Sequence, residues 1–429
     1  MSGIDVFPAP DGDAAAPRAS DAYPGRNPLV LRRSEQGCCP ACAGRALAPV
    51  LKLADVPTNS CLMLDSPEEA KAYPRGDIEL VFCEGCGFVF NRALDPLLTE
   101  YSDRYEPTQA YSPTFQRWHR DLAARVSGAL DLRGKTVVEV GCGQGEFLHL
   151  LGGLAGCRGV GFDPCVDARR ADVVGERARD VELVADFFSD ASIEGLTADV
   201  LLSKMTLEHI PAAGRFFRLA ERVAKASAPG MRLFIQIPES ERIFRDLALE
   251  DVYYEHCNYF TEVSLAGLFR RHGFTVEEVT REYDGQYLTI LGRYSGEAAA
   301  VGGADAEGVA EPRRLVMRFA ATWAGRVEAW RAMVAERRAR GGRVAVWGSG
   351  SKGVSFLSAI GGGEAVSHVV DINPHRQGRF MVGTGHPIVG PAALKDVAPT
   401  TVVVMNPIYR REVADLLAGL GLRPELLTL

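Results

Sequence analysis

The chain has 429 residues, of which 47% are hydrophobic, and a formal net charge of -7 at pH 7. This length and composition allow two or three domains with buried cores and exclude a largely disordered chain. The sequence has no basic stripe, no run approaching about 18 apolar residues and no secretory N-terminus, so we expect a cytoplasmic protein without membrane spans or a nucleic-acid-binding surface.

The N-terminal segment, residues 1–33, is rich in Ala, Pro, Asp and Gly and has little periodicity. Such a composition cannot bury enough apolar surface to offset the entropy of ordering. We therefore expect a disordered leader.

Two Cys-x-x-Cys pairs follow, in a lobe expected over residues 34–100. Two such loops supply four thiolates, as a closed tetrahedral zinc site requires, so we predict structural zinc. Cys38 adjoins the first pair and is an alternative ligand to Cys39. The other interpretation is four unrelated thiols, since free cysteine is often a small buried apolar residue. The predicted ligands are Cys39, Cys42, Cys83 and Cys86.

The central segment, residues 101–295, opens with features of a nucleotide-binding crevice. A β-branched run at 136–140 is followed by three alternate glycines and then by a helical pattern. Glycines let the backbone approach a ligand, and the helix start offers free N–H groups. A second strand ends at Asp163, where a carboxylate can accept hydrogen bonds from both ribose hydroxyls. The glycines are Gly141, Gly143 and Gly145.

The pattern continues as an alternating series of strands and helices. Two final strands joined at Asp284-Gly285 predict a hairpin, because such dipeptides favour tight turns. Together these elements predict an α/β fold with a doubly wound sheet and an antiparallel edge. The further strands are expected at 181–186, 199–203, 231–238, 274–283 and 287–294.

Residues 251–260 concentrate groups that can move a proton. A histidine can act as a base near neutral pH, a tyrosine can donate to an oxyanion, and a neighbouring glutamate can fix the tautomer of the histidine. His209, after the fourth strand, belongs to the same carboxyl edge of the sheet. The alternative is an aromatic cluster that packs under the sheet. The candidates are Tyr253, Glu255 and His256.

The C-terminal part begins with an expected linker at 296–312 and an amphipathic helix at 313–340, within a domain reaching residue 429. A strand then leads into a GxGxxG loop, and Asp371 follows 18 residues after Gly353. Read locally, this predicts NAD binding and an oxidoreductase. The alternative, which we favour, is a Rossmann-like module without its own cofactor that closes over the substrate, with Lys352 able to meet phosphate.

The central motifs resemble those of class I S-adenosylmethionine methyltransferases. Glu139 begins the Glu-x-Gly-x-Gly-x-Gly loop, and Asp163, Asp186 and Leu-Glu-His follow in that order. The resemblance implies that the three glycines approach the amino-acid part of the cofactor, that Asp163 holds its ribose and that Asp186 lies beside its adenine. It also implies that Glu139 is a cofactor-binding residue.

The whole chain, from the four cysteines to the C-terminal Rossmann-like domain, resembles the three-domain C-methyltransferases of deoxysugar and antibiotic biosynthesis. This implies methylation of carbon 3 of a nucleotide-linked 4-keto-6-deoxysugar through an enolate. The sequence does not reveal the oligomeric state, and we expect a monomer. Two segments depart from the family pattern: the Gly348 loop is closer to a true fingerprint, and Met405-Asn406 replaces a more aromatic sequence. The implied catalytic residues are His256 as base with Tyr253, His209 and Glu255, and the implied substrate residues are Tyr105 and Tyr111.

Three alternatives remain open on the sequence. The enzyme could methylate another small acceptor on carbon or oxygen, or it could be the oxidoreductase described above. The third alternative is a binding scaffold with a zinc ribbon and degenerate nucleotide folds. The intact glycine loop and Asp163 argue against that degeneracy.

Overall fold

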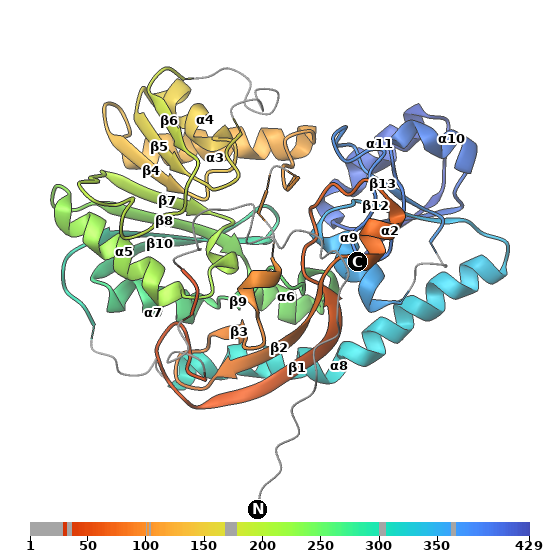
Figure 1. Ribbon diagram of the computed structural model, residues 1–429, viewed down its shortest axis with the longest axis horizontal. Helices are drawn as coiled ribbons and strands as arrows, with labels where there is room; N and C mark the ends of the chain where they lie inside the picture. Colours follow the sequence, from red (N-terminus) through yellow and green to blue (C-terminus); the bar gives the residue numbers. More distant parts are fainter. Residues whose placement is uncertain are drawn as a thin grey trace, which may run out of the picture.

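The protein is built around three β-sheets. The seven-stranded sheet and the five-stranded sheet lie on opposite sides of Figure 1, with the four-stranded sheet below them. The computed structural model describes residues 29–31, 37–99, 101–102, 104–167, 178–299, 306–361 and 366–429.

The seven-stranded sheet has the order β10-β11-β8-β7-β4-β5-β6. All neighbours from β8 to β6 pair in parallel, and β11 is antiparallel to both β8 and β10. This confirms the doubly wound α/β fold with an antiparallel edge. Its strands are β4 (Thr136–Val140), β5 (Arg158–Phe162), β6 (Val181–Val184), β7 (Val200–Lys204), β8 (Arg232–Pro238), β10 (Phe274–Glu282) and β11 (Tyr287–Tyr294).

Helices cover both faces of this sheet because its strands are apolar on both sides. In β4, Val137 packs with α3 (Pro113–Leu130) and α4 (Glu146–Ala155), whereas the next residue, Val138, packs with α5 (Ala213–Ala226) and α7 (Glu262–Arg271) on the opposite face. The period of two places successive side chains in different cores.

The hairpin expected at Asp284-Gly285 is confirmed. Strands β10 and β11 pair in antiparallel register, with Glu282 opposite Tyr287. Tyr283, Asp284 and Gly285 all have positive φ, which a tight turn at this position requires.

The four-stranded sheet joins the N-terminal segment to the central domain. Three antiparallel strands come from the N-terminal segment, and β9 (Asn258–Tyr259) pairs with β3 from the region of the predicted catalytic residues. The N-terminal elements are β1 (Leu47–Pro57), α2 (Pro67–Ala72), β2 (Arg75–Cys83), β3 (Val89–Asn91) and a short 3₁₀ helix, η2 (Pro96–Leu98).

The C-terminal domain is a five-stranded parallel sheet in the order β14-β13-β12-β15-β16. Short helices connect its strands. These elements are β12 (Val344–Trp347), α9 (Ser351–Ala359), β13 (His368–Val370), β14 (Ile388–Val389), η5 (Pro391–Ala393), α10 (Leu394–Val397), β15 (Thr401–Val404), η6 (Pro407–Tyr409), α11 (Arg410–Gly419) and β16 (Glu425–Thr428).

The long helix α8 (Ala306–Ala339) runs from beneath the four-stranded sheet to the C-terminal domain (Figure 1). It begins seven residues before the expected start at 313, so the expected linker is partly helical. Ala and Glu favour helix even without an apolar stripe, and the helix accommodates Pro312. Among the described residues, none of the helices is both long enough and apolar enough to cross a bilayer.

The expected disordered leader lies outside the described residues, except for residues 29–31. Leu29 is buried in the central core, and its carbonyl accepts a hydrogen bond from the N–H of Ala212 at 3.0 Å. These three residues therefore pack beside α5.

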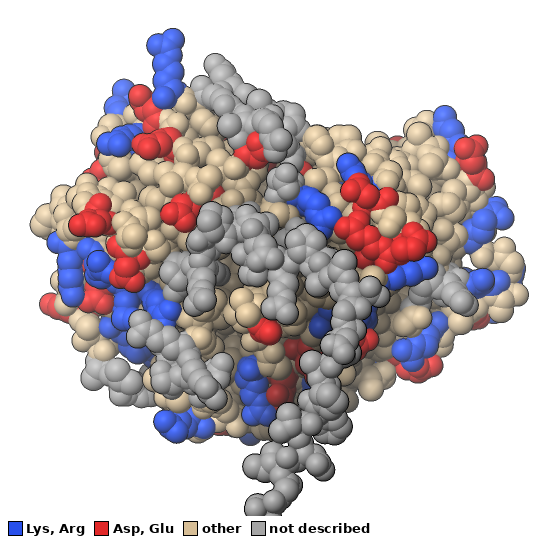
Figure 2. Space-filling model, in the orientation of Figure 1, with Lys and Arg blue, Asp and Glu red and all other residues tan. Residues whose placement is uncertain are grey.

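Charged side chains are distributed over the visible face of the molecule. In Figure 2 the Lys and Arg side chains alternate with Asp and Glu, and those drawn in colour form no continuous basic stripe. This agrees with the mixed charge of the sequence.

Candidate active site

A cavity of 360 Å³ opens at the carboxyl ends of β4 and β7. Strand β4 is flanked by β5 on one side and β7 on the other, so the chain winds in opposite directions from this point. Ligands of open α/β sheets bind at such switch points. The cavity is lined by the loops after these strands, by α3 and by residues 105–109.

The loop after β4 forms one wall of this cavity. Gly141, Gly143 and Gly145 all have positive φ, a conformation that other residues rarely adopt. A Cβ atom on Gly141 would collide with the side chain of Thr206. Position 141 therefore requires a glycine, because the backbone there lies against Thr206.

Asp163 lies at the same edge and faces the loop. Its two carboxylate oxygens accept hydrogen bonds from the N–H groups of Gly143 at 2.9 Å and Cys165 at 2.7 Å. Each oxygen keeps a further lone pair for a ligand hydroxyl. Asp186 also lines the cavity, and its side chain caps the N–H of Phe187 at 2.7 Å.

Glu139 supplies an acidic group at the floor of the cavity. It is 2% exposed, and its Oε2 atom has no hydrogen-bond partner among the described residues. Burial raises the pKa of Glu139 to about 7. A buried acceptor without a partner needs a donor from a ligand. The glycine loop, Asp163 and Glu139 thus match the diol and the ammonium group of S-adenosylmethionine.

A cluster of tyrosine, histidine and glutamate residues occupies the other end of the cavity. The Tyr253 hydroxyl lies 2.6 Å from Nε2 of His256, and that nitrogen lies 3.9 Å from Oε1 of Glu208. Burial keeps the pKa of His256 well below its usual value and raises the pKa of Tyr253, so both are neutral near pH 7. A neutral imidazole can accept a proton, and a neutral phenol can donate one.

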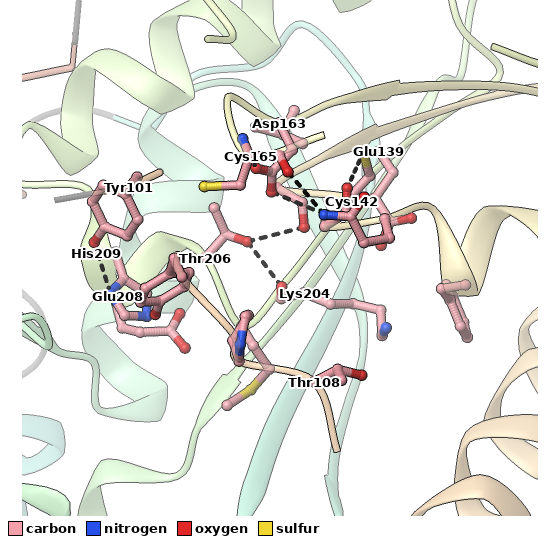
Figure 3. Close-up of a pocket in the computed structure, with 18 of the residues that line it drawn as sticks. Tyr101, Thr108, Glu139, Cys142, Asp163, Cys165, Lys204, Thr206, Glu208 and His209 are labelled. Atoms are coloured by element: carbon pink, nitrogen blue, oxygen red, sulfur yellow. Dashed lines mark hydrogen bonds between the residues drawn. The ribbon is translucent and has the colours of Figure 1, made fainter. Parts of the chain in front are cut away.

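His209 lies beside this pair. Its ring centroid is 4.8 Å from that of His256, and its Nδ1 lies 3.2 Å from the Tyr101 hydroxyl. Figure 3 shows Tyr101, Glu208 and His209 together on one side of the cavity. Burial lowers the pKa of His209 to about 4, so it too is neutral.

Asn258 holds the two histidine-bearing segments together. Its side-chain amide donates to the carbonyls of Leu207 at 3.2 Å and Ile210 at 2.6 Å, which flank the 3₁₀ helix η3 (Leu207–His209). Because Asn258 is also part of β9, its main chain is paired with β3 of the N-terminal segment. Three parts of the chain therefore fix the positions of His209 and His256.

Glu255 faces the N-terminal segment rather than the imidazole of His256. Its carboxylate accepts hydrogen bonds from Ser60 Oγ and from Asn59 Nδ2, the latter at 3.3 Å. Tyr105 also interacts with it, and burial raises the pKa of Glu255 to about 7. Among the described contacts, Glu208 is the carboxylate that approaches His256, so the expected partnership of Glu255 with His256 is not seen.

A second cavity, of 240 Å³, lies between the central and C-terminal domains and shares Tyr253 and His256 with the first. Lys352 lines it and pairs with Asp251, which also binds Arg242 at 2.6 Å. Tyr111 lines this second cavity, whereas Tyr105 lines the first. The structure therefore divides the three expected substrate residues between two adjoining spaces.

The C-terminal glycine loop uses its acidic residue internally. Asp371 accepts hydrogen bonds from the N–H of Ser349 at 2.9 Å, the hydroxyl of Ser349 at 2.6 Å and the N–H of Asn373 at 2.9 Å. Three of its lone pairs are thus committed to its own fold.

The four cysteines of the two Cys-x-x-Cys pairs converge on one point. Their sulfur atoms all lie within 4.8 Å of one another, with Cys39 3.7 Å from Cys86 and Cys42 3.6 Å from Cys83. None of the four forms a disulfide, and Cys38 lies outside the cluster. Four converging thiols fit the donor set of a tetrahedral zinc ion.

The sequence did not identify Glu208, Tyr101 and Lys204 as site residues, although all three line the first cavity. Glu208 was visible only within the Leu-Glu-His motif, and Tyr101 only at the edge of a tyrosine-rich segment. Lys204 ends a strand that begins with three apolar residues, which was the available indication of a functional position.

Comparisons with known proteins agree with this architecture. Residues 114–279 match the family described as "Methyltransferase domain", and residues 304–421 match the "C-methyltransferase C-terminal domain". The C-methyltransferase NovU of Streptomyces niveus is 27% identical over 396 residues, covering 88% of this chain and 91% of NovU.

Two solved structures are similar to part of the chain. A Burkholderia thailandensis 1,6-didemethyltoxoflavin-N1-methyltransferase, with bound S-adenosylhomocysteine, is 21% identical, covers 42% of this chain and 81% of its own, and has a TM-score of 0.34. A methyltransferase from Aquifex aeolicus is 17% identical, covers 44% of this chain and 99% of its own, and has a TM-score of 0.33.

The two family matches cover the domain that holds the glycine loop and the domain that holds the Gly348 loop. They place the Gly348 loop in a methyltransferase domain, so we do not adopt the oxidoreductase alternative. This chain is an S-adenosylmethionine-dependent methyltransferase, in which a methyltransferase domain is joined to a domain of the C-methyltransferase C-terminal family.

Proposed function

We propose that the enzyme methylates carbon 3 of a nucleotide-linked 4-keto-6-deoxysugar. The observation that carries this proposal is the position of Tyr253 and His256, which line both cavities. The first, beside the glycine loop, is the cofactor cavity, and the second, between the domains, is the interdomain cavity. An acceptor bound in the interdomain cavity would contact Tyr253 and His256 where this cavity adjoins the cofactor cavity. The similarity to NovU, named a C-methyltransferase, supports carbon as the acceptor atom.

The protein residues perform the proton chemistry. S-adenosylmethionine supplies an electrophilic methyl group when bound. A carbon next to a ketone becomes nucleophilic when a base removes its proton, and His256 is neutral and placed to accept it. Tyr253 keeps its proton and can turn from His256 to donate to the enolate oxygen, which frees Nε2. The Tyr101 hydroxyl contacts His209, and the carboxyl group of Glu208 lies 3.9 Å from His256.

The interdomain cavity has the chemistry to hold a nucleotide sugar. Lys352 and Arg242 place two cations near Asp251, and Arg376 also lines the space. Cations bind phosphate oxygens through charge-assisted hydrogen bonds. Tyr111 and Tyr409, also on this cavity, offer aromatic surfaces for a base or sugar.

We further propose that Cys39, Cys42, Cys83 and Cys86 bind one structural zinc ion. The cluster packs in the same core as α5 and α7, and the carbonyl of Pro40 accepts a hydrogen bond from Gly214 at 3.1 Å. The four cysteines therefore pack against the central domain, and none of them lines the cofactor cavity.

Solvent deuterium exchange tests the proposed chemistry. With S-adenosylhomocysteine bound, the wild-type enzyme should exchange the hydrogen on the carbon beside the ketone of the sugar, because the base acts without methyl transfer. His256→Ala should abolish exchange and lower turnover by about 100-fold or more. His272→Ala, which changes a histidine paired with Glu221 away from the cavities, is the control. A product methylated on oxygen would overturn the proposal.

A further inference from the structure

Among the described residues, the half-buried ammonium of Lys204, which lines the cofactor cavity, has no ion-pair partner within 4.0 Å. Lys204 is the last residue of β7, and its neighbour Ser203 pairs with Val140 of β4, so Lys204 stands next to Gly141 at the carboxyl edge. Its Nζ atom lies 3.1 Å from Nε2 of His119 and 3.9 Å from the centre of the Phe147 ring. Among the described residues, none of the ion pairs within 4.0 Å includes Lys204.

No carboxylate among the described residues forms a direct ion pair with this ammonium. Burial lowers the pKa of Lys204, while Glu139 and Glu146 act in the opposite direction through longer-range attraction. His119 is neutral, because burial lowers its pKa to about 2, and can only accept a hydrogen bond from the lysine. A cation that is partly removed from water is costly unless an anion pairs with it.

Glu139 presents the opposite charge in the same cavity. Its Oε2 atom is buried without a hydrogen-bond partner among the described residues. In Figure 3 Lys204 extends toward the side of the view that holds Glu139 and Cys142, away from Tyr101 and His209. One cation and one acid, neither in contact with the other, thus line the end of the cavity next to the glycine loop.

A ligand that carries an ammonium and a carboxylate on one carbon complements this pair. The amino-acid end of S-adenosylmethionine is such a group, and the glycine loop admits it close to the backbone. We propose that Lys204, held by His119, binds the α-carboxylate of the cofactor and so distinguishes S-adenosylmethionine from analogues without a carboxylate. This inference rests on the cofactor class and is independent of the acceptor.

Calorimetric binding of two cofactor forms tests it. Decarboxylated S-adenosylmethionine keeps the adenosine, the sulfonium and the amine and lacks only the carboxylate. Lys204→Met should weaken binding of S-adenosylmethionine by about 10- to 100-fold, the effect of one charge-assisted hydrogen bond in a buried site, and change binding of the decarboxylated form by about twofold or less. Methionine keeps the shape of the lysine stem and removes a partly buried charge, so we expect the variant to fold.

Lys135→Met is the matched control. Lys135 precedes β4 at the opposite edge of the same sheet and donates to the carbonyl of Leu130 at 2.6 Å. Its replacement should leave both affinities unchanged. Lys204→Arg, which keeps the cation, should retain most of the preference for the carboxylate form.

Each contrary result overturns the inference. Equal losses for both cofactor forms in Lys204→Met would show that the lysine only shapes the cavity, and no loss would show that it does not bind the cofactor. If the variant were unstable, wild-type enzyme that bound both forms equally would be sufficient to reject the proposal. Since binding is measured without an acceptor, an error in the sugar assignment would leave these results unchanged.

Discussion

The Oε1 atom of Glu208 lies 3.9 Å from Nε2 of His256, and the two residues are 1% and 5% exposed. Neither oxygen of Glu208 has a hydrogen-bond partner among the described residues. Burial raises the pKa of Glu208 to about 8 and lowers that of His256. At neutral pH the pair is therefore mostly a protonated acid beside a neutral imidazole, which is the least costly combination in a buried site.

This arrangement suits a base that must gain a proton in a buried position. A neutral Glu208 places no buried charge beside the neutral base. When His256 becomes charged, its positive charge lowers the pKa of Glu208. Glu208 acts through His256 and is a positioning residue under the proposed function.

The first prediction concerns Glu208→Gln. Glutamine keeps the shape of the side chain and cannot ionise, so turnover should fall by about tenfold or more and the pH dependence of the rate should lose the step associated with the pair. Affinity for S-adenosylhomocysteine should stay near wild type. Glu221→Gln is the control, because it changes a glutamate that contacts His272 outside the cavities at 3.1 Å. Rates and pH profiles equal to wild type would contradict the role.

Glu208→Gln should also change how stability depends on pH. The folded-state pKa of Glu208 lies above its unfolded value, so its contribution to stability is fully present below about pH 4.5 and is lost as pH rises through about 8. The wild-type protein should therefore lose more unfolding free energy between about pH 5 and about pH 8 than the variant. Urea unfolding at both pH values measures the difference. A variant with the larger loss would show that the direction of the shift is wrong.

The second prediction concerns zinc. The purified protein should carry about one zinc ion per chain, and Cys39→Ser should lose the metal because a four-thiolate site does not tolerate loss of one ligand. The variant should also be less soluble, since the cluster packs against the central core. Metal analysis decides the question, and Cys38→Ser, outside the cluster, is the control. Full stability without metal would reject the site, and metal lost only from Cys38→Ser would reassign a ligand.

The central fold could be predicted from the sequence because its information is local. The β-branched run of β4, the glycines after it and the hairpin at Asp284-Gly285 each lie within a few residues and obey simple rules of conformation. The start of α8 could not be predicted, because residues 306–312 lack such a local pattern. Residues 306–312 have no apolar stripe, and their helical structure follows from Ala and Glu propensity together with the helix that continues beyond them.

The contacts within the site could only partly be predicted, because they join distant segments. The sequence indicated that His209 and His256 share an edge, but Asn258 brings them together by bonding to the carbonyls on either side of η3. Glu208 rather than Glu255 is the neighbour of His256. The carboxylate of Glu255 instead accepts hydrogen bonds from Ser60 and Asn59, which precede it by almost 200 residues. No local pattern encodes such a choice.

The third prediction concerns the acceptor. Lys352→Met should raise KM for the nucleotide sugar by about tenfold with little change in kcat, because the lysine binds phosphate away from the reacting carbon. Asp251 would keep its contact with Arg242, so the domain interface should remain intact. Lys395→Met, an exposed lysine on α10, is the control. Steady-state kinetics measure both constants. An unchanged KM in Lys352→Met would contradict the proposal that this lysine binds a phosphate of the acceptor.

The fourth prediction compares two aspartates in equivalent places. Asp163 and Asp371 each follow the second strand of a parallel strand pair, β4-β5 and β12-β13. Each accepts a hydrogen bond at 2.9 Å from a main-chain N–H of the glycine loop after the first strand of its pair. Only Asp163 lines the cavity beside Glu139. Asp163→Ala should therefore weaken S-adenosylhomocysteine binding by about 10- to 100-fold, through loss of charge-assisted hydrogen bonds to the ribose and of support for Gly143.

Asp371→Ala should leave S-adenosylhomocysteine affinity unchanged, although it removes the same local support from the Gly348 loop. Calorimetry on both variants measures the contrast, and titration with NAD should give no heat of binding in either, because the Asp371 oxygens are already bound to Ser349 and Asn373. Tight NAD binding that depends on Asp371 would show that the C-terminal loop holds a nucleotide of its own. Equal losses of S-adenosylhomocysteine affinity in the two variants would mean that loop support, rather than contact with the ribose, explains the effect of Asp163.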